Sequence, residues 1–147
     1  MQTEPRLLPV TQEKFELRSA NTSDEARLDI KAKGFWRKGE TAFFDVRVTH
    51  VNSESSKNLD TSKQFRRHED AKKREYLERV LEVEHATFTP LVFGTNGGMG
   101  EECGRFLTHL ASKLSDKSNE KYSDTITWLR TRLSMELTRA SLLCLRG

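Results

Sequence analysis

Residues 26–51 most constrain how this chain can fold, because apolar and polar residues alternate along them in two runs. In the first run the apolar positions are Leu28, Ile30 and Ala32. In the second run they are Ala42, Phe44, Val46 and Val48. A period of two is typical of a β-strand with one buried face. Gly34 and Gly39 lie between the runs, so the sequence predicts a β-hairpin whose turn is centred near Arg37.

Two aspartates of this hairpin lie on the face opposite the aliphatic side chains. A turn near Arg37 places Asp29 and Asp45 opposite each other, where like charges repel. Two interpretations follow, and the spacing favours neither. The carboxylates are solvated, as most charged strand residues are, or they hold a hard cation such as Mg²⁺, which takes one or two carboxylates together with water and phosphate oxygens.

A long helix is predicted over residues 61–84, which contain no Gly or Pro and carry i,i+4 pairs of opposite charge. One face of this helix carries Lys73, Tyr76, Leu77 and Val80. The Lys73 ammonium either reaches solvent along its own stem or lies near the aspartates, where it would stabilise charge on a phosphate. Lys72 is an alternative, because it too is one turn from Tyr76.

The remaining elements are a strand over residues 85–93, a glycine loop over 94–100, a helix over 101–114, a linker over 116–121 and a final helix ending near residue 145. Pro90 favours an edge position for the strand. The loop has the strand-to-helix context of an anion site but neither phosphate-loop motif, which favours a turn with unusual φ angles. We expect one α/β domain over residues 12–147, with helices packed on a small sheet, after a flexible tail of residues 1–11.

Composition excludes some classes of protein. No apolar run is long enough to span a membrane. Cys103 and Cys144 lie far apart in the sequence, which favours a reduced intracellular setting over the alternative of a disulfide. The four histidines form no zinc pattern, which indicates that there is no zinc site. The net charge of +3 is too small to indicate a nucleic-acid partner by itself, but it leaves room for basic patches.

Four motifs in order carry a resemblance: RLD at residues 27–29, FFDVRV at 43–48, KKREY at 72–76 and TNGGMG at 95–100. Together they resemble the restriction-like endonuclease domain, of the PD-(D/E)xK superfamily, at the C-terminal end of some LINE-type retrotransposon polyproteins. The resemblance covers roughly residues 12–147. The wider run is similar to stand-alone fragments of mobile-element reverse-transcriptase genes in animal genomes.

The resemblance implies a restriction-endonuclease-like core, in which a small mixed sheet with a central hairpin is flanked by helices. It implies a metal-dependent DNA endonuclease in which Asp29 and Asp45 bind Mg²⁺ or Mn²⁺, Lys73 stabilises the developing charge and Tyr76 positions Lys73. Contacts to the nucleic-acid backbone are expected from Arg47, Arg66, Arg67 and Lys72. Glu13 and Glu16 are alternative sources of a third carboxylate.

Two residues depart from the family pattern. Leu28 stands where the motif has proline, and Arg47 stands where the usual strand lysine would be. Because arginine is a poor proton acceptor, the lysine is expected on the helix, at Lys73. The implied partners are DNA or an RNA–DNA hybrid and a reverse-transcriptase domain of the parent polyprotein, in the nucleus and away from membranes. The alternatives are an inactive nucleic-acid-binding remnant and an assembly module that uses the C-terminal helices.

Overall fold

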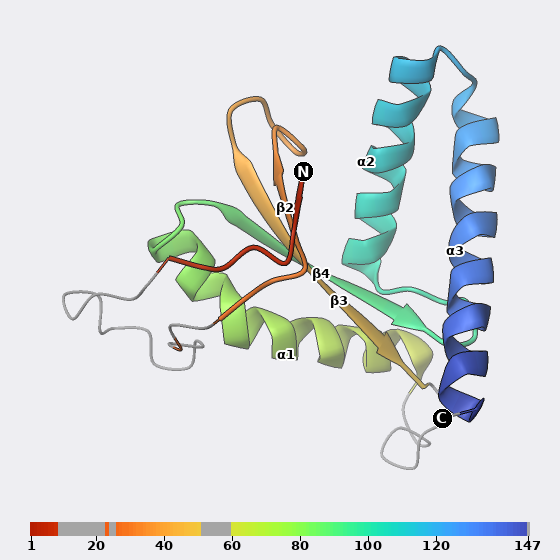
Figure 1. Cartoon of the computed structure of the whole chain (residues 1–147), viewed down its shortest axis with the longest axis horizontal. Coiled ribbons are helices and arrows are strands. Elements are labelled where there is room, and N and C mark those ends of the chain that lie inside the picture. Colours follow the sequence, from red (N-terminus) through yellow and green to blue (C-terminus); the bar gives the residue numbers. More distant parts are fainter. Residues whose placement is uncertain (9–22, 24–25, 51–59, 147) are drawn as a thin grey trace. The chain divides into compact units, whose positions relative to one another are not determined.

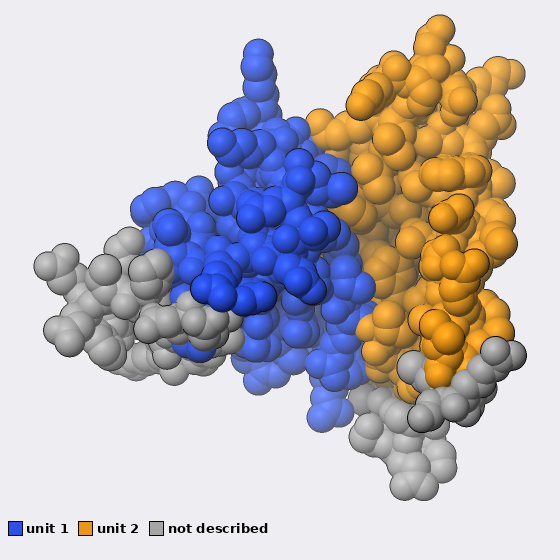
Figure 2. Space-filling model, in the orientation of Figure 1, with its two compact units in different colours: residues 1–47, 66–91 blue, residues 48–65, 92–147 orange. Residues whose placement is uncertain are grey.

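The computed structural model describes residues 1–8, 23, 26–50 and 60–146 (Figure 1). The chain divides into two compact units (Figure 2). Unit 1 consists of Met1–Arg47 and Arg66–Leu91, and unit 2 of Val48–Phe65 and Val92–Gly147. The single domain expected over residues 12–147 stays a prediction.

Four strands and three helices make up the fold: β1 (Gln2–Thr3), β2 (Ile30–Lys33), β3 (Thr41–Thr49), α1 (Thr61–Glu82), β4 (Thr87–Gly94), α2 (Glu101–Ser118) and α3 (Tyr122–Arg146). The strands form one sheet in the order β1-β2-β3-β4. Both β1 with β2 and β2 with β3 pair antiparallel. In Figure 1 the arrows of β3 and β4 point the same way, with α1 as the connection between them, so the sheet is mixed. The predicted α/β class is confirmed: a small mixed sheet with a central hairpin, flanked by helices.

The register of the hairpin follows the sequence pattern. Ile30 pairs with Phe44 and Lys33 with Thr41. This register centres the turn on Arg37 and makes Asp29 the next partner of Asp45. Gly34 and Gly39 adopt φ angles of 68° and 85°, the left-handed region that glycine enters without a steric penalty.

The two faces of β3 differ from the prediction of one buried and one polar face. Residues 42–45 are buried on both faces, whereas Val46 and Val48 are 40% and 48% exposed. Phe43 points into the core beneath α1, and Phe44 packs against Phe35 at 5.1 Å between ring centroids. Since side chains two apart share a face, Asp45 lies on the same face as Phe43. The face predicted to be solvated is therefore the one that α1 covers.

The core of unit 1 joins α1 to the sheet and to the beginning of the chain. It consists of Leu7, Ala26, Leu28, Phe43, Tyr76, Val80, Ala86 and Phe88. The predicted flexible tail is wrong for residues 1–8, because Gln2–Thr3 pair with β2 and Leu7 is 4% exposed. The carbonyl of Pro5 accepts a hydrogen bond from the Leu28 amide at 3.2 Å, which ties this segment to the strand leading into β2. Residues 9–11 of that tail lie outside the described part.

Unit 2 contains a helical hairpin. Leu107 and Ala111 of α2 pack against Ile126 and Leu129 of α3. The linker predicted over 116–121 is shorter than expected, because α2 continues to Ser118 and ends where Asn119 adopts a left-handed conformation with φ 55°. Among the described residues, no helix is long and apolar enough to cross a membrane.

Candidate functional site

Asp29 and Asp45 lie next to each other at the base of the β2–β3 hairpin. The Asp29 carboxylate accepts a hydrogen bond from the Val46 amide, with 2.6 Å between Val46 N and Asp29 Oδ2. Asp29 is half-buried and Asp45 is 6% exposed. The solvated interpretation is therefore wrong for Asp45. The hairpin pairing and the cover that α1 provides bring two carboxylates together in a largely dry place.

Lys72 of α1 supplies the positive charge at this pair. Its Nζ lies 2.7 Å from Asp45 Oδ2, and the side chains of Lys72 and Asp45 are only 20% and 9% exposed. The same Nζ lies 5.6 Å from the centroid of the Tyr76 ring, one turn further along α1. The sequence singled out Lys73 and assigned Lys72 to the nucleic-acid backbone. The structure instead places Lys72 against the aspartate, while Lys73 lies about 100° further around the helix.

The charges of this cluster are coupled. Burial raises the pKa of Asp45 above 3.8; the ion pair and hydrogen bond with Lys72 oppose this, and the neighbouring Asp29 raises the pKa further. Burial lowers the pKa of Lys72, but its hydrogen bond to Asp45 and the charges of Asp45, Glu75 and Tyr76 outweigh burial and raise it above 10.5. Lys72 is therefore firmly cationic, and the ionised form of Asp45 depends on it.

A second group of cationic side chains lies along the same strand and helix. Burial lowers the pKa of His68 below 6.5, and the charges of Arg47 and Arg67 lower it further. Arg47 from β3 and Arg67 from α1 are thus near enough to His68 for their charges to act on its imidazole. Arg47 is two residues from Asp45, and His68 is four residues from Lys72, so this group continues the Asp45–Lys72 face. Arg66, the fourth residue expected to contact nucleic acid, is exposed.

The site has the donor set that a hard cation needs at minimum. Asp29 and Asp45 offer two adjacent carboxylates, and Mg²⁺ completes its shell with water and phosphate oxygens. No group of three or more His, Cys, Asp and Glu side chains that could hold a metal occurs among the described residues. Glu13 and Glu16, the predicted sources of a third carboxylate, lie outside them. Among the described residues, the side chains therefore fit a Mg²⁺ site that uses two protein carboxylates, those of Asp29 and Asp45.

The glycine loop is a structural turn. Its amides donate within the protein: Gly94 to the Gly98 carbonyl, Thr95 to Thr49, Gly97 to Gly94 and Gly100 to Val92 at 2.7–3.0 Å, and Gly98 to Asn96 Oδ1 at 3.0 Å. Gly97 adopts φ 88°. Glu101 and Glu102 in the first turn of α2 would repel an anion. These contacts favour a strand-to-helix turn over an anion-binding site in this loop.

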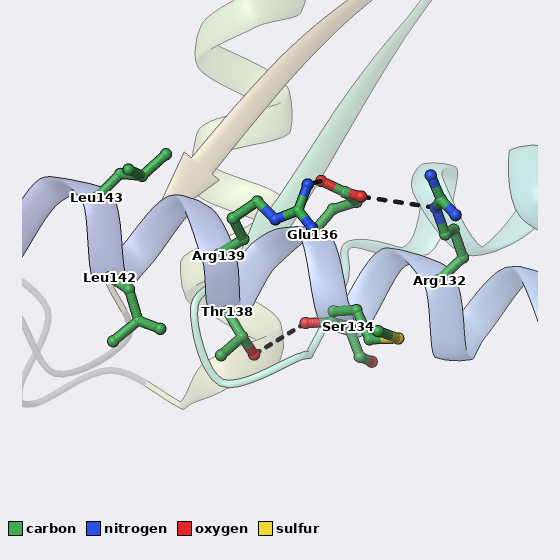
Figure 3. A pocket seen from close by; sticks show the side chains of 8 residues that line it. Arg132, Ser134, Glu136, Thr138, Arg139, Leu142 and Leu143 are labelled. Atoms are coloured by element: carbon green, nitrogen blue, oxygen red, sulfur yellow. Dashed lines mark hydrogen bonds and ion pairs between the residues drawn. The ribbon is translucent and has the colours of Figure 1, made fainter.

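A hollow of 590 Å³ lies along the C-terminal half of α3 in unit 2 (Figure 3). Apolar side chains of Met135, Leu142 and Leu143 line it together with Arg132 and Arg139. Glu136 lies 3.5 Å from Arg132 and 3.9 Å from Arg139, which reduces the positive charge that this helix face presents. The hollow contains none of the carboxylates or the lysine discussed above, so it is not the candidate site.

Lys72 was the alternative to Lys73 in the sequence analysis, and the sequence contains a signal that favours it. The buried stripe of α1 runs through Phe65, Glu69, Lys72, Tyr76 and Val80, with helical spacings of three and four. A helix face that begins at Phe65 includes Lys72. The face used in the sequence analysis begins at Lys73 and therefore leaves Lys72 out. Glu69 is 6% exposed and belongs to the same stripe.

Comparison of the chain with protein-family models, with curated proteins and with solved structures found no match. Any statement about function therefore depends on the residues and their geometry.

Proposed function

We propose that this chain is a metal-dependent DNA endonuclease that hydrolyses phosphodiester bonds. The observation that carries the proposal is the cluster of Asp29, Asp45 and Lys72, in which two adjacent carboxylates share a largely buried place with an ammonium 2.7 Å from Asp45 Oδ2. Two carboxylates suit Mg²⁺ or Mn²⁺, and a fixed cation suits a phosphate substrate. The order of these residues along the chain is also that of the resemblance stated above.

Asp29 and Asp45 would hold the metal ion. When bound, such an ion supplies Lewis-acid polarisation of the phosphate and lowers the pKa of a coordinated water. The Val46 amide orients the Asp29 carboxylate before any ligand arrives. In this proposal Lys72 rather than Lys73 stabilises the negative charge that develops on the phosphate, and the Tyr76 ring positions the Lys72 ammonium. Arg47 and Arg67 bind flanking phosphates, a contribution that salt weakens.

The proposal extends to the expected partners. DNA or an RNA–DNA hybrid is the substrate, and a reverse-transcriptase domain of a parent polyprotein and a nuclear location stay predictions from the resemblance.

The test is nicking of supercoiled plasmid DNA by Asp45→Asn, with Asp70→Asn as the matched control. Asp70 is an exposed carboxylate on the same helix as Lys72. We expect Mg²⁺-dependent nicking by the wild type, a loss of roughly 10²-fold or more in Asp45→Asn, and unchanged nicking in Asp70→Asn. Asp45→Ala should lose nicking equally while circular dichroism shows a folded chain. Nicking by either Asp45 variant at the wild-type rate sinks the proposal.

A second candidate is a nucleic-acid-binding remnant without catalysis. It is favoured by Arg47, a poor proton acceptor at the strand position where the superfamily has lysine, and by the ion pair with Lys72 that already balances the charge of Asp45. This candidate predicts salt-sensitive DNA binding by the wild type and no nicking with Mg²⁺ or Mn²⁺ at any concentration.

A further inference from the structure

The turn of the β2–β3 hairpin carries a concentrated positive charge that the candidate site does not use. Within residues 30–41 the sequence has Lys31, Lys33, Arg37 and Lys38 against the single acidic residue Glu40. Three of them, Lys33, Arg37 and Lys38, are exposed, and we call these three the basic tip. Figure 1 shows this turn extending away from the rest of the sheet.

Little in the turn neutralises the basic tip. Glu40 lies 3.9 Å from Arg37, and the side chains are 46% and 80% exposed. An ion pair with this exposure is worth little, because solvent and salt screen it. By contrast, Lys31 lies 5.4 Å from the centroid of the Phe43 ring, on the face that α1 covers. Lys31 is therefore left out of the basic tip.

The tip is held in shape before any partner arrives. Phe35 is 9% exposed and packs edge-on against Trp36 at 4.7 Å and Phe44 at 5.1 Å between centroids. The Gly34 amide donates to the Glu40 carbonyl at 2.7 Å, and the Glu40 amide donates to the Arg37 carbonyl at 3.2 Å. A stiff turn loses less conformational entropy on binding than a mobile loop. The aromatic rings pack on one another, which favours contact with phosphates over stacking of unpaired bases.

The two strands that carry the basic tip also carry the carboxylate pair. Lys33 is four residues from Asp29, which corresponds to about 13 Å along an extended strand. Phosphates on one strand of duplex DNA follow one another at about 3.4 Å along the helix axis. A duplex with one phosphate at Asp29 and Asp45 would thus present further backbone phosphates within a span of this length.

We propose that the basic tip is a clamp for the phosphate backbone of duplex DNA beside the Asp29–Asp45 site. The inference rests on the proposed function for its choice of partner. It adds a contact element that recognises charge and not sequence, since all three side chains are exposed cations on a preformed turn. Such contacts release counterions, so each makes the slope of log K against log salt more negative by about 0.9.

The test measures binding of the full chain to a fluorescent duplex by anisotropy over a series of KCl concentrations, in EDTA so that no cleavage occurs. The tip variant is Lys33→Gln/Arg37→Gln/Lys38→Gln. The matched control, Lys117→Gln/Lys121→Gln/Arg130→Gln, removes the same charge from exposed positions of unit 2. We expect the tip variant to bind about tenfold or more weakly at low salt, with a slope smaller in magnitude by about 2–3, and the control to change little. Arg37→Gln/Lys38→Gln, which leaves the strand residue Lys33 in place, should reduce the magnitude of the slope by about 2.

Three results would overturn the clamp: a tip variant that retains the wild-type slope, a control that loses as much as the tip variant, or a wild type that binds single strands alone or no DNA. The outcome is separable from that of the nicking assay. Loss of binding by the tip variant together with full nicking by Asp45→Asn supports the clamp and removes the proposed catalytic site. Wild-type binding by the tip variant together with loss of nicking by Asp45→Asn overturns the clamp and supports the proposed catalytic site.

Discussion

Replacing Lys72 by methionine tests the central ion pair, because it removes the ammonium group and keeps an unbranched apolar side chain that is one atom shorter. The substitution leaves Asp45, which is 6% exposed, with its carboxylate in a largely dry place and Asp29 beside it. Breaking a fully buried ion pair costs about 3–5 kcal/mol, whereas an exposed pair contributes about 0.2–1 kcal/mol. Because the Lys72 side chain is 20% exposed, we expect a loss of about 2–3 kcal/mol in the free energy of unfolding, between these limits.

Urea unfolding near pH 7 in EDTA, followed by circular dichroism, measures this loss. Lys63→Met on the exposed side of α1 is the control, with an expected change within about 0.5 kcal/mol. Asp45→Asn removes the charge that needs Lys72, so Lys72→Met should cost less in that background. A double-mutant cycle should give a coupling free energy of at least about 1 kcal/mol between residues 45 and 72. The same cycle with Lys73→Met should give a coupling close to zero, because Lys73 is not among the charges that shift the pKa of Asp45.

Two results would refute the role of this ion pair. One is a Lys72→Met variant that is no more destabilised than Lys63→Met, and the other is a cycle without coupling between residues 45 and 72. A coupling of Asp45 to Lys73 as large as its coupling to Lys72 would favour Lys73, the lysine that the sequence analysis preferred.

Two further predictions concern the pH dependence of stability and the glycine loop. Because the pKa of Asp45 is raised above 3.8 in the folded chain, its stabilising contribution is fully present below pH 3.8 and is lost as the pH rises through the folded-state value. The free energy of unfolding of the wild type minus that of Asp45→Asn should therefore decline in urea titrations as the pH rises above 3.8 and through the raised folded-state pKa, and a flat or rising difference contradicts this. In Gly94→Ala the new Cβ would lie 2.5 Å from Asn96 Oδ1 and 2.9 Å from Phe65 Cζ, so we expect a loss of about 1–3 kcal/mol. Gly104→Ala in α2 meets no atom within 4 Å and should gain up to about 1 kcal/mol; equal effects of the two substitutions would be inconsistent with the packing of Phe65 on the loop.

Local sequence pattern was sufficient for the β2–β3 hairpin, α1, β4 and the carboxylate pair, but not for β1, which was expected to be a flexible tail. The alternation on either side of Gly34 and Gly39 predicts where the turn is centred, and the register across it then brings Asp29 opposite Asp45 without any knowledge of the tertiary structure. A run free of Gly and Pro predicts α1, observed at Thr61–Glu82. Pro90 predicts an edge strand because it lacks a donor, and β4 is at the edge of the sheet. Each of these depends on interactions between residues close in sequence or joined by one tight turn.

Tertiary packing decided how far the Asp29–Asp45 pair is buried and which lysine lies beside it. A strand with alternating residues has two candidate inner faces, and only the docking of α1 buries the face of Phe43 and Asp45. Lys72 and Lys73 are both within one turn of Tyr76, so spacing cannot choose between them. They point about 100° apart, and the rotation of α1 about its own axis is set when Phe65, Tyr76 and Val80 are buried. That rotation places Lys72 at 2.7 Å from Asp45, because packing of the apolar side chains outweighs any preference of a single lysine.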